Sequence, residues 1–232
     1  MTSTLKVDEL QNSLGGSDIK IGSLKHPDAS GTNVTLASDG SATATLSSTS
    51  VVPASVGSSM VFLEKFTASS TSEKIFNLDS FTSYNNYIFK LNAIQSTSDP
   101  SNFRMVVGTS SSSFFESDSN YQAAQGHSYY NGTSSGGAND QTSTNSLYKA
   151  NSLGNNTGYG ASGTINLFSP TNSSIYTSAK AEIVTYNENQ YTQSRNAGGY
   201  RTAGSDDAYV KFFFSAGSIA SGTITLYGIK DA

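Results

Sequence analysis

Hydrophobic and polar residues alternate along most of this chain, and the alternation is strongest after Met60. A period of two residues is typical of strands that bury one face, because successive side chains of a strand point to opposite sides. The pattern predicts strands at residues 60–66, 74–78, 87–95, 103–108, 163–168, 179–186, 208–215 and 222–230. In the last of these, Tyr227 is followed by Gly228 and Ile229, which predicts a bulge near the chain end.

No stretch of helical length after Met60 carries an apolar stripe between capping residues, so we expect helix only in one or two short turns. Several strands joined by polar connections favour two packed antiparallel sheets. We therefore predict an all-β chain whose main domain, residues 58–232, is a jelly-roll-like antiparallel β-sandwich.

Residues 1–57 contain no aromatic side chain, and their aliphatic residues occur as short alternating groups. So few small aliphatic side chains bury too little surface to hold the segment folded alone. Either the segment is a flexible arm, or neighbouring chains complete its core, and the regular alternation favours the second. We predict a thin β module whose core is completed by three copies of the chain, through Leu5, Val7, Leu10, Ile19, Ile21, Val34 and Leu36.

Residues 110–160 are rich in Ser, Gly, Asn and Thr and hold few aliphatic residues. We interpret them as a long insertion in the sandwich, and long loops often carry function. The tyrosines of this stretch either anchor the loop or offer flat apolar faces beside hydroxyl groups, which suit stacking on a sugar. The predicted ligand-binding residues are Tyr121, Tyr129, Tyr130 and Tyr148.

Composition narrows the class of protein. Charged residues make up only 13% of the chain, so uncharged polar groups must keep it in solution, and the aromatic share of 11% argues against disorder. The net charge of −4 is mild and there is no basic cluster, which argues against a nucleic-acid partner. No apolar run approaches the ~20 residues of a membrane-spanning helix, and we expect no secretory signal. The absence of cysteine excludes disulfides and thiolate metal sites.

Two motif matches point to chemistry that the surrounding residues do not support. Residues 132–136 fit the nucleophile-elbow pattern G-x-S-x-G around Ser134, but that motif needs a strand-to-helix turn and a base, and the two histidines are His26 and His127. Residues 158–163 fit the dinucleotide pattern G-x-G-x-x-G, but they lead into a predicted strand and not into a helix. We therefore predict no catalytic residue and no cofactor.

Carboxylates are sparse, and the closest pair is Asp206–Asp207, where we expect the adjacent side chains to point apart into solvent. Glycoside hydrolysis by two acids is an alternative, but no suitable pair is evident. A calcium site at Asp39 or at Asp206–Asp207 is another, but neither place has the spaced oxygen ligands of a known loop. We predict no metal, and the sequence leaves open whether an ion binds at Asp206 and Asp207.

Both ends of the chain resemble a family of viral proteins. The opening TSTLKVDELQ at residues 2–11, with the short strands near 19–21 and 33–36, resembles the amino-terminal ends of small fibre and decoration proteins of marine and cyanobacterial tailed bacteriophages. The segments YVKFFF at 209–214 and GTITLYGI at 222–229 are similar to the closing strands of the β-sandwich heads on such proteins. The resemblance implies a virion component, usually trimeric, with its amino-terminal end on the particle and its head outward. It supplies no catalytic residue.

The leading hypothesis is a non-enzymatic virion protein, a trimeric fibre or spike whose head binds host-surface glycan. Its expected partners are copies of itself, capsid or tail proteins contacted through residues 1–57, and host carbohydrate. The alternative is a decoration protein that clamps capsid subunits and binds no host, and a polysaccharide-degrading enzyme comes third. We expect the protein to be made in the host cytoplasm and to act on the virion.

Overall fold

The computed structural model describes residues 23–24, 34–36, 42–44 and 60–230, apart from 117–118, 131, 133–134, 143–145 and 188. The chain divides into two units, Met1–Gly57 and Ser58–Ala232, and each is described by itself. In the first unit, the short strands β1 (Ser23–Leu24), β2 (Val34–Leu36) and β3 (Ala42–Ala44) form an antiparallel sheet in that order.

Two of the predicted oligomer contacts, Val34 and Leu36, lie in strand β2, where their Cα partners are Ala44 and Ala42 of β3. The others lie outside the described residues, and they are Leu5, Val7, Leu10, Ile19 and Ile21. The trimer and the attachment of this unit to a particle stay predictions.

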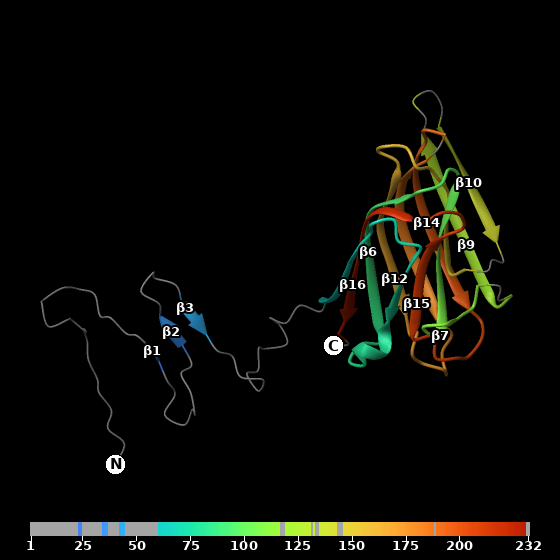
Figure 1. Cartoon of the computed structure of the whole chain (residues 1–232). Coiled ribbons are helices and arrows are strands. Elements are labelled where there is room, and N and C mark those ends of the chain that lie inside the picture. The colour runs from blue at the N-terminus through green and yellow to red at the C-terminus, as the bar shows by residue number, and fades with distance from the viewer. Residues whose placement is uncertain are drawn as a thin grey trace, which may run out of the picture. The chain divides into compact units, whose positions relative to one another are not determined.

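The second unit consists of two antiparallel sheets (Figure 1). The large sheet has the strand order β10-β9-β14-β13-β12-β6-β16-β4. Its strands are β4 (Met60–Thr67), β6 (Asn86–Ser96), β9 (Tyr121–Tyr130), β10 (Ser135–Thr142), β12 (Gly160–Phe168), β13 (Ser178–Tyr186), β14 (Thr192–Arg201) and β16 (Ile219–Ile229). The small sheet has the order β11-β7-β15-β5, and β8 pairs with β7. Its strands are β5 (Glu73–Asn77), β7 (Ser101–Ser110), β8 (Ser113–Phe114), β11 (Tyr148–Leu153) and β15 (Tyr209–Phe214).

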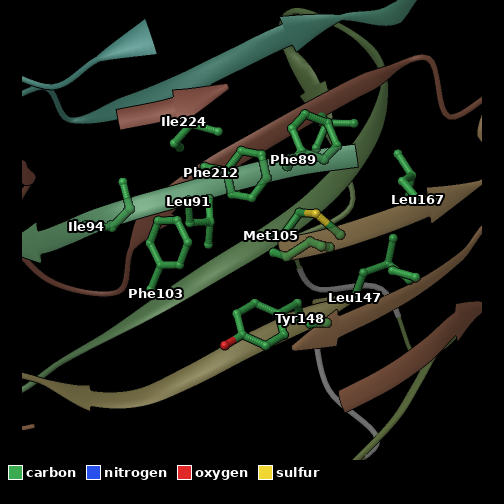
Figure 2. Close-up of a cluster of buried hydrophobic side chains, with 14 of the residues drawn as sticks. Phe89, Leu91, Ile94, Phe103, Met105, Leu147, Tyr148, Leu167, Phe212 and Ile224 are labelled. Carbon is green, nitrogen blue, oxygen red and sulfur yellow. The ribbon is translucent and has the colours of Figure 1, made fainter. Parts of the chain in front are cut away.

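Aromatic and aliphatic side chains from both sheets share one core, part of which is drawn in Figure 2. The ring of Phe89, from the large sheet, lies 5.3 Å from that of Phe76 and 5.0 Å from that of Phe212, both from the small sheet. Phe103 of β7 stacks on Phe212 at 5.7 Å. Because burial of apolar surface contributes ~25 cal/mol per Å², we expect this core, whose residues all come from one chain, to hold the second unit folded.

The all-β prediction is confirmed, because the helix among the described residues is one 3-10 turn, η1 (Leu78–Phe81). Each predicted strand overlaps an observed one, and these are β4, β5, β6, β7, β12, β13, β15 and β16. The predicted bulge near the chain end is confirmed by the shift of register between Leu226 and Tyr227, where β16 pairs with β4. The two sheets form a β-sandwich, and its jelly-roll connectivity stays a prediction.

The interpretation of residues 110–160 as one long loop is wrong. These residues supply β8, β9, β10 and β11, and the hairpin of β9 and β10 extends one edge of the large sheet. The sequence pattern does not predict strand β9, because the inward positions between Tyr121 and Tyr129 are small or polar. These positions are Ala123, Gln125 and His127. Ten consecutive pairs with β14 hold this strand in the sheet in spite of its weak apolar pattern.

Candidate functional site

The outer face of the large sheet carries an open groove of about 790 Å³ over strands β9, β14, β13 and the end of β12. The residues that line the groove are Gln122, Ala123, Ala124, Phe168, Ser178, Ala179, Lys180, Gly198, Gly199 and Tyr200. Four strands that are adjacent in the sheet therefore build it, although their residues come from distant parts of the sequence.

Strand register places two aromatic rings on either side of a serine. Phe168 of β12 lies opposite Ser178 of β13, and Ser178 lies opposite Tyr200 of β14. Residues that are directly opposite in a sheet project from the same face. Neighbouring strands lie ~4.8 Å apart, so the two aromatic residues stand roughly 10 Å apart across the short serine side chain.

The floor of the groove is low because its residues are small. In the next row, Lys180 lies opposite Gly198, and Gly198 lies opposite Ala124. A Cβ atom added to Gly198 would meet only the carbonyl oxygen of Ala179, at 3.8 Å, so the space above this residue is open. A Cβ atom on Gly199, which faces inward, would lie 2.9 Å from the carbonyl oxygen of Leu147. The two glycines thus let β14 lie close to the segment below it and leave its upper surface flat.

Both aromatic side chains are accessible, with 40% of Phe168 and 56% of Tyr200 exposed. An aromatic ring presents an apolar face, and tyrosine adds a hydroxyl group at its edge. Ser178 and Gln122 bring further polar groups to the groove. This combination suits a ligand with an apolar face and hydroxyl groups around its rim, which describes a sugar ring.

The exposed charges on the four strands that build the groove cancel. Lys180 Nζ forms an exposed ion pair with Glu182 Oε1 at 2.8 Å. The other charged residues in β9, β12, β13 and β14 are Arg195 and Arg201, which are both buried. A ligand in the groove therefore meets a nearly neutral surface, and no cluster of cations favours a phosphate or a polyanion.

A buried polar network fixes the ends of two of the four groove strands, β13 and β14. Arg201, the residue after Tyr200, pairs with Asp207 at 2.9 Å between Nη1 and Oδ1. The hydroxyl group of Thr177, the residue before Ser178, donates a hydrogen bond to Asp207 Oδ2, with the two oxygens 2.6 Å apart. The backbone N–H of Arg201 also donates to the carbonyl oxygen of Thr177 at 2.9 Å. These bonds hold the ends of β13 and β14 together, and so they position the wall of the groove.

The expectation that Asp206 and Asp207 both point into solvent is wrong for Asp207, which is completely buried. Ser205 Oγ donates to Asp207 Oδ1 at 2.7 Å, so the carboxylate is bound by an arginine and two hydroxyl groups. Asp206 is exposed at the surface. Its pKa is raised, first because its carboxyl group is partly desolvated and then because the carboxylates of Asp79 and Asp207 repel its charge. Among the described residues, no three His, Cys, Asp or Glu side chains gather as metal ligands would. Asp39 lies outside that part of the chain.

The four predicted ligand-binding tyrosines do not come together. Tyr121 is completely buried, and its hydroxyl oxygen accepts a hydrogen bond from Val107 N–H at 3.1 Å. Tyr148 lies in the core among Phe103, Met105 and Leu147, as Figure 2 shows. Neither ring offers a face at the surface, so burial removes the basis on which both were predicted.

The other two tyrosines lie at one end of the hairpin of β9 and β10. Tyr129 is half-buried and stacks on Tyr191, with ring centroids 5.2 Å apart and planes 12° apart. Tyr130 is exposed, and its hydroxyl group donates to the carbonyl oxygen of Gly132 at 3.0 Å. Ligand binding by these two stays a prediction.

The motif matches lie in the settings that the sequence indicates. Gly158 precedes β12, which begins at Gly160, so the G-x-G-x-x-G match enters a strand and not a helix. Ser135 and Gly136, from the G-x-S-x-G match, begin strand β10, whereas Ser134 lies outside the described residues. His127 lies within β9. That the chain is not an enzyme stays a prediction.

The sequence does not reveal the groove, because Phe168 and Tyr200 are 32 positions apart in the chain. Only the pairing of both residues with Ser178 places them on the same part of the sheet. Strand β14 itself was not predicted, since its sequence TQSRNAGGYR has no run of alternating apolar residues. One signal was present. Phe168 ends a predicted strand in which Ile165 and Leu167 face inward, so its alternation places Phe168 on the outer face.

No helix in the described part of the chain has the length and hydropathy that a membrane crossing requires. Comparison of the chain with protein-family models, with curated proteins and with solved structures gives no match.

Proposed function

We propose that this chain is a non-enzymatic structural protein of a bacteriophage particle, a trimeric fibre- or spike-type appendage whose β-sandwich head binds carbohydrate on the host surface. The observation that carries the binding role is the groove between Phe168 and Tyr200, which has a flat floor and accessible aromatic walls. Aromatic rings beside hydroxyl and amide groups are the side chains that suit a sugar ring.

The place of the groove supports recognition in preference to catalysis. It lies on an open sheet face, and the described residues that line it include no Asp, Glu, His or Cys. Lys180, the one charged side chain among the described lining residues, is paired with Glu182. Groups of these kinds can bind and orient a sugar, but they supply no acid or base for its hydrolysis, which uses two carboxyl groups.

The role in the virion rests on the resemblance of both chain ends to phage fibre and decoration proteins. In the proposal, residues 1–57 attach the protein to the particle and hold three chains together. Three heads then present equal grooves to a surface on which the same glycan is repeated. Linked weak sites can exceed the affinity of one site by about 10²–10⁴-fold, so each groove need bind only weakly.

Electron microscopy of intact particles, with gold-labelled antibody against this chain, tests the proposed location. The proposal expects label on a tail or on a surface appendage, together with binding of the purified full chain to host cells that free surface polysaccharide inhibits. Label spread evenly over the capsid, with no binding to host cells, would contradict the proposal and favour capsid decoration. Loss of viscosity when the chain is incubated with the polysaccharide would contradict the non-enzymatic part.

A further inference from the structure

The far end of the same sheet face carries a second pair of exposed aromatic residues. Tyr186 of β13 lies opposite Thr192 of β14, and Thr192 lies opposite Tyr130 of β9. The exposed fraction is 37% for Tyr186 and 56% for Tyr130. As in the groove, two aromatic side chains flank one short hydroxyl side chain, and the three residues come from three adjacent strands.

Local contacts hold this second pair in place. The ring of Tyr186 packs edge-on against that of Tyr159, with centroids 5.3 Å apart and planes 77° apart. The hydroxyl group of Tyr130 donates to the carbonyl oxygen of Gly132. Rings that are already positioned lose little conformational entropy when a ligand stacks on them.

A polar hollow lies between the two aromatic pairs. It measures about 190 Å³ and is lined by Gly126, His127, Ser128, Ser194 and Asn196, which belong to β9 and β14. Along β14, the groove at Gly198–Tyr200 is followed by the hollow at Ser194 and Asn196, and then by the second pair at Thr192. The eight positions from Tyr200 to Thr192 correspond to roughly 26 Å at ~3.3 Å per residue.

We infer that these features form one extended binding track, which follows β9 and β14 and holds a linear, neutral polysaccharide. Phe168 and Tyr200 bind one part of the glycan, Tyr130 and Tyr186 bind another, and the small polar side chains between them contact its hydroxyl groups. The inference rests on the proposed function and deepens it, because it names the class of glycan and adds a second aromatic subsite.

The chemistry of the face favours a sugar polymer over a peptide or an acidic ligand. An extended peptide is usually bound at a sheet edge, where backbone groups are free to pair, whereas this track runs over the face of inner strands. An acidic polymer needs cations, and Lys180 is already paired with Glu182. A long neutral track with apolar rings at both ends matches a chain of uncharged sugars.

The dependence of affinity on ligand length tests the inference. The full-length chain is first screened on a glycan array, and the neutral linear glycan with the strongest signal is then cut into fragments of increasing length. For the wild type, we expect affinity to rise with length until one fragment spans both aromatic pairs, and then to level off. In the double variant Tyr130→Ser/Tyr186→Ser, long fragments should bind at least about tenfold more weakly, because the loss of even one of the two stacking contacts accounts for about tenfold. Fragments that are too short to span the track should bind to this variant with the same affinity as to the wild type.

A matched control is Ile175→Ser/Tyr176→Ser, which alters two residues of similar exposure that line neither the groove nor the hollow, and it should bind all fragments as the wild type does. Thermal unfolding shows whether each variant is folded.

Equal affinity of the Tyr130→Ser/Tyr186→Ser variant and the wild type for long fragments overturns the track. It leaves the proposed function in place if Phe168→Ala/Tyr200→Ala still weakens binding by about tenfold or more. A wild type that binds no glycan overturns both, and preferential binding of an extended peptide overturns the assignment to carbohydrate.

Discussion

Arg201 and Asp207 form an ion pair inside the second unit, with Nη1 and Oδ1 2.9 Å apart and both side chains almost completely buried. Arg201 also lies over the ring of Phe115, with its guanidinium carbon 3.5 Å from the ring centroid. The pair links β14 to the segment before β15, next to the wall of the groove. Removing one partner leaves the other charge buried without compensation, which costs about 3–5 kcal/mol.

We therefore expect Asp207→Asn to lower the free energy of unfolding by about 3–5 kcal/mol, measured by urea denaturation. The matched control is Lys180→Gln, which breaks the exposed pair with Glu182 and should change the free energy of unfolding by less than about 1 kcal/mol. Equal effects of the two substitutions would contradict the structural role of the buried pair.

Two buried tyrosine hydroxyl groups should respond in opposite ways to removal. The hydroxyl group of Tyr148 is buried and has no hydrogen-bond partner among the described residues, whereas that of Tyr121 accepts from Val107 N–H. We expect Tyr148→Phe to leave the free energy of unfolding unchanged or to raise it by ~1 kcal/mol, because an unsatisfied buried polar group is removed. Tyr121→Phe should lower it by ~1–3 kcal/mol, because the N–H of Val107 loses its acceptor. Urea denaturation of both variants checks the signs, and a large loss with Tyr148→Phe would contradict the account.

Tyr87 gives the fold a predicted sensitivity to alkali. Its hydroxyl group donates to the carbonyl oxygens of Phe81 and Tyr84, at 3.1 and 3.0 Å. Burial, followed by the charges of Asp79 and Tyr84, raises the pKa of Tyr87 from 10.0 to about 12. Because the folded-state pKa lies above the unfolded one, the stabilisation is fully present below pH 10 and is lost as the pH rises toward 12.

The free energy of unfolding should therefore fall between pH 10 and pH 12, and it should fall less in Tyr87→Phe than in the wild type. Urea denaturation at a series of pH values measures both slopes. The comparison with the variant separates Tyr87 from the other tyrosines that ionise in the same range. Parallel slopes in the two proteins would exclude Tyr87 as the source.

The sequence pattern reveals those strands whose inner residues are large and apolar. The strand at 86–96 is one of them, because the large apolar residues Tyr87, Phe89 and Leu91 recur at every second position, and burial then fixes which face is inward. Strands β9 and β14 could not be found this way, since glycine, alanine and amide side chains fill many of their positions. These strands are defined by pairing with neighbours that are distant in sequence.

The candidate site shows the same limit more sharply. Composition indicates that tyrosines are abundant, but it does not tell which of them are exposed. That Tyr200 is exposed and Tyr121 is buried follows only from the register of the strands in which they lie. Exposure depends on which face each position takes, and one added residue in a strand would exchange the two faces. A pattern that is polar on both faces does not determine that choice.

Separating the two units tests the proposed oligomer. The core of the second unit closes within one chain, so residues 58–232 alone should fold and unfold cooperatively as a monomer. The full chain should sediment as a trimer, because residues 1–57 have too few apolar side chains to close a core in one copy. Sedimentation velocity of both proteins at micromolar concentration measures the states. A monomeric full chain, or a trimer formed by residues 58–232 alone, would contradict the assignment of trimerisation to the first unit.

The measurement that tests the central claim most directly is the Kd of the full-length chain for its best neutral glycan, compared between the wild type and Phe168→Ala/Tyr200→Ala. Both side chains are exposed, so their removal should leave the thermal unfolding temperature nearly unchanged. Phe62→Ala is the matched control, because Phe62 is an exposed aromatic residue on β4, at the opposite edge of the same sheet. We predict that the Kd of the groove variant rises by about tenfold or more, whereas that of the Phe62 variant does not change. Equal Kd values for the wild type and a folded groove variant would contradict the claim that this groove binds carbohydrate.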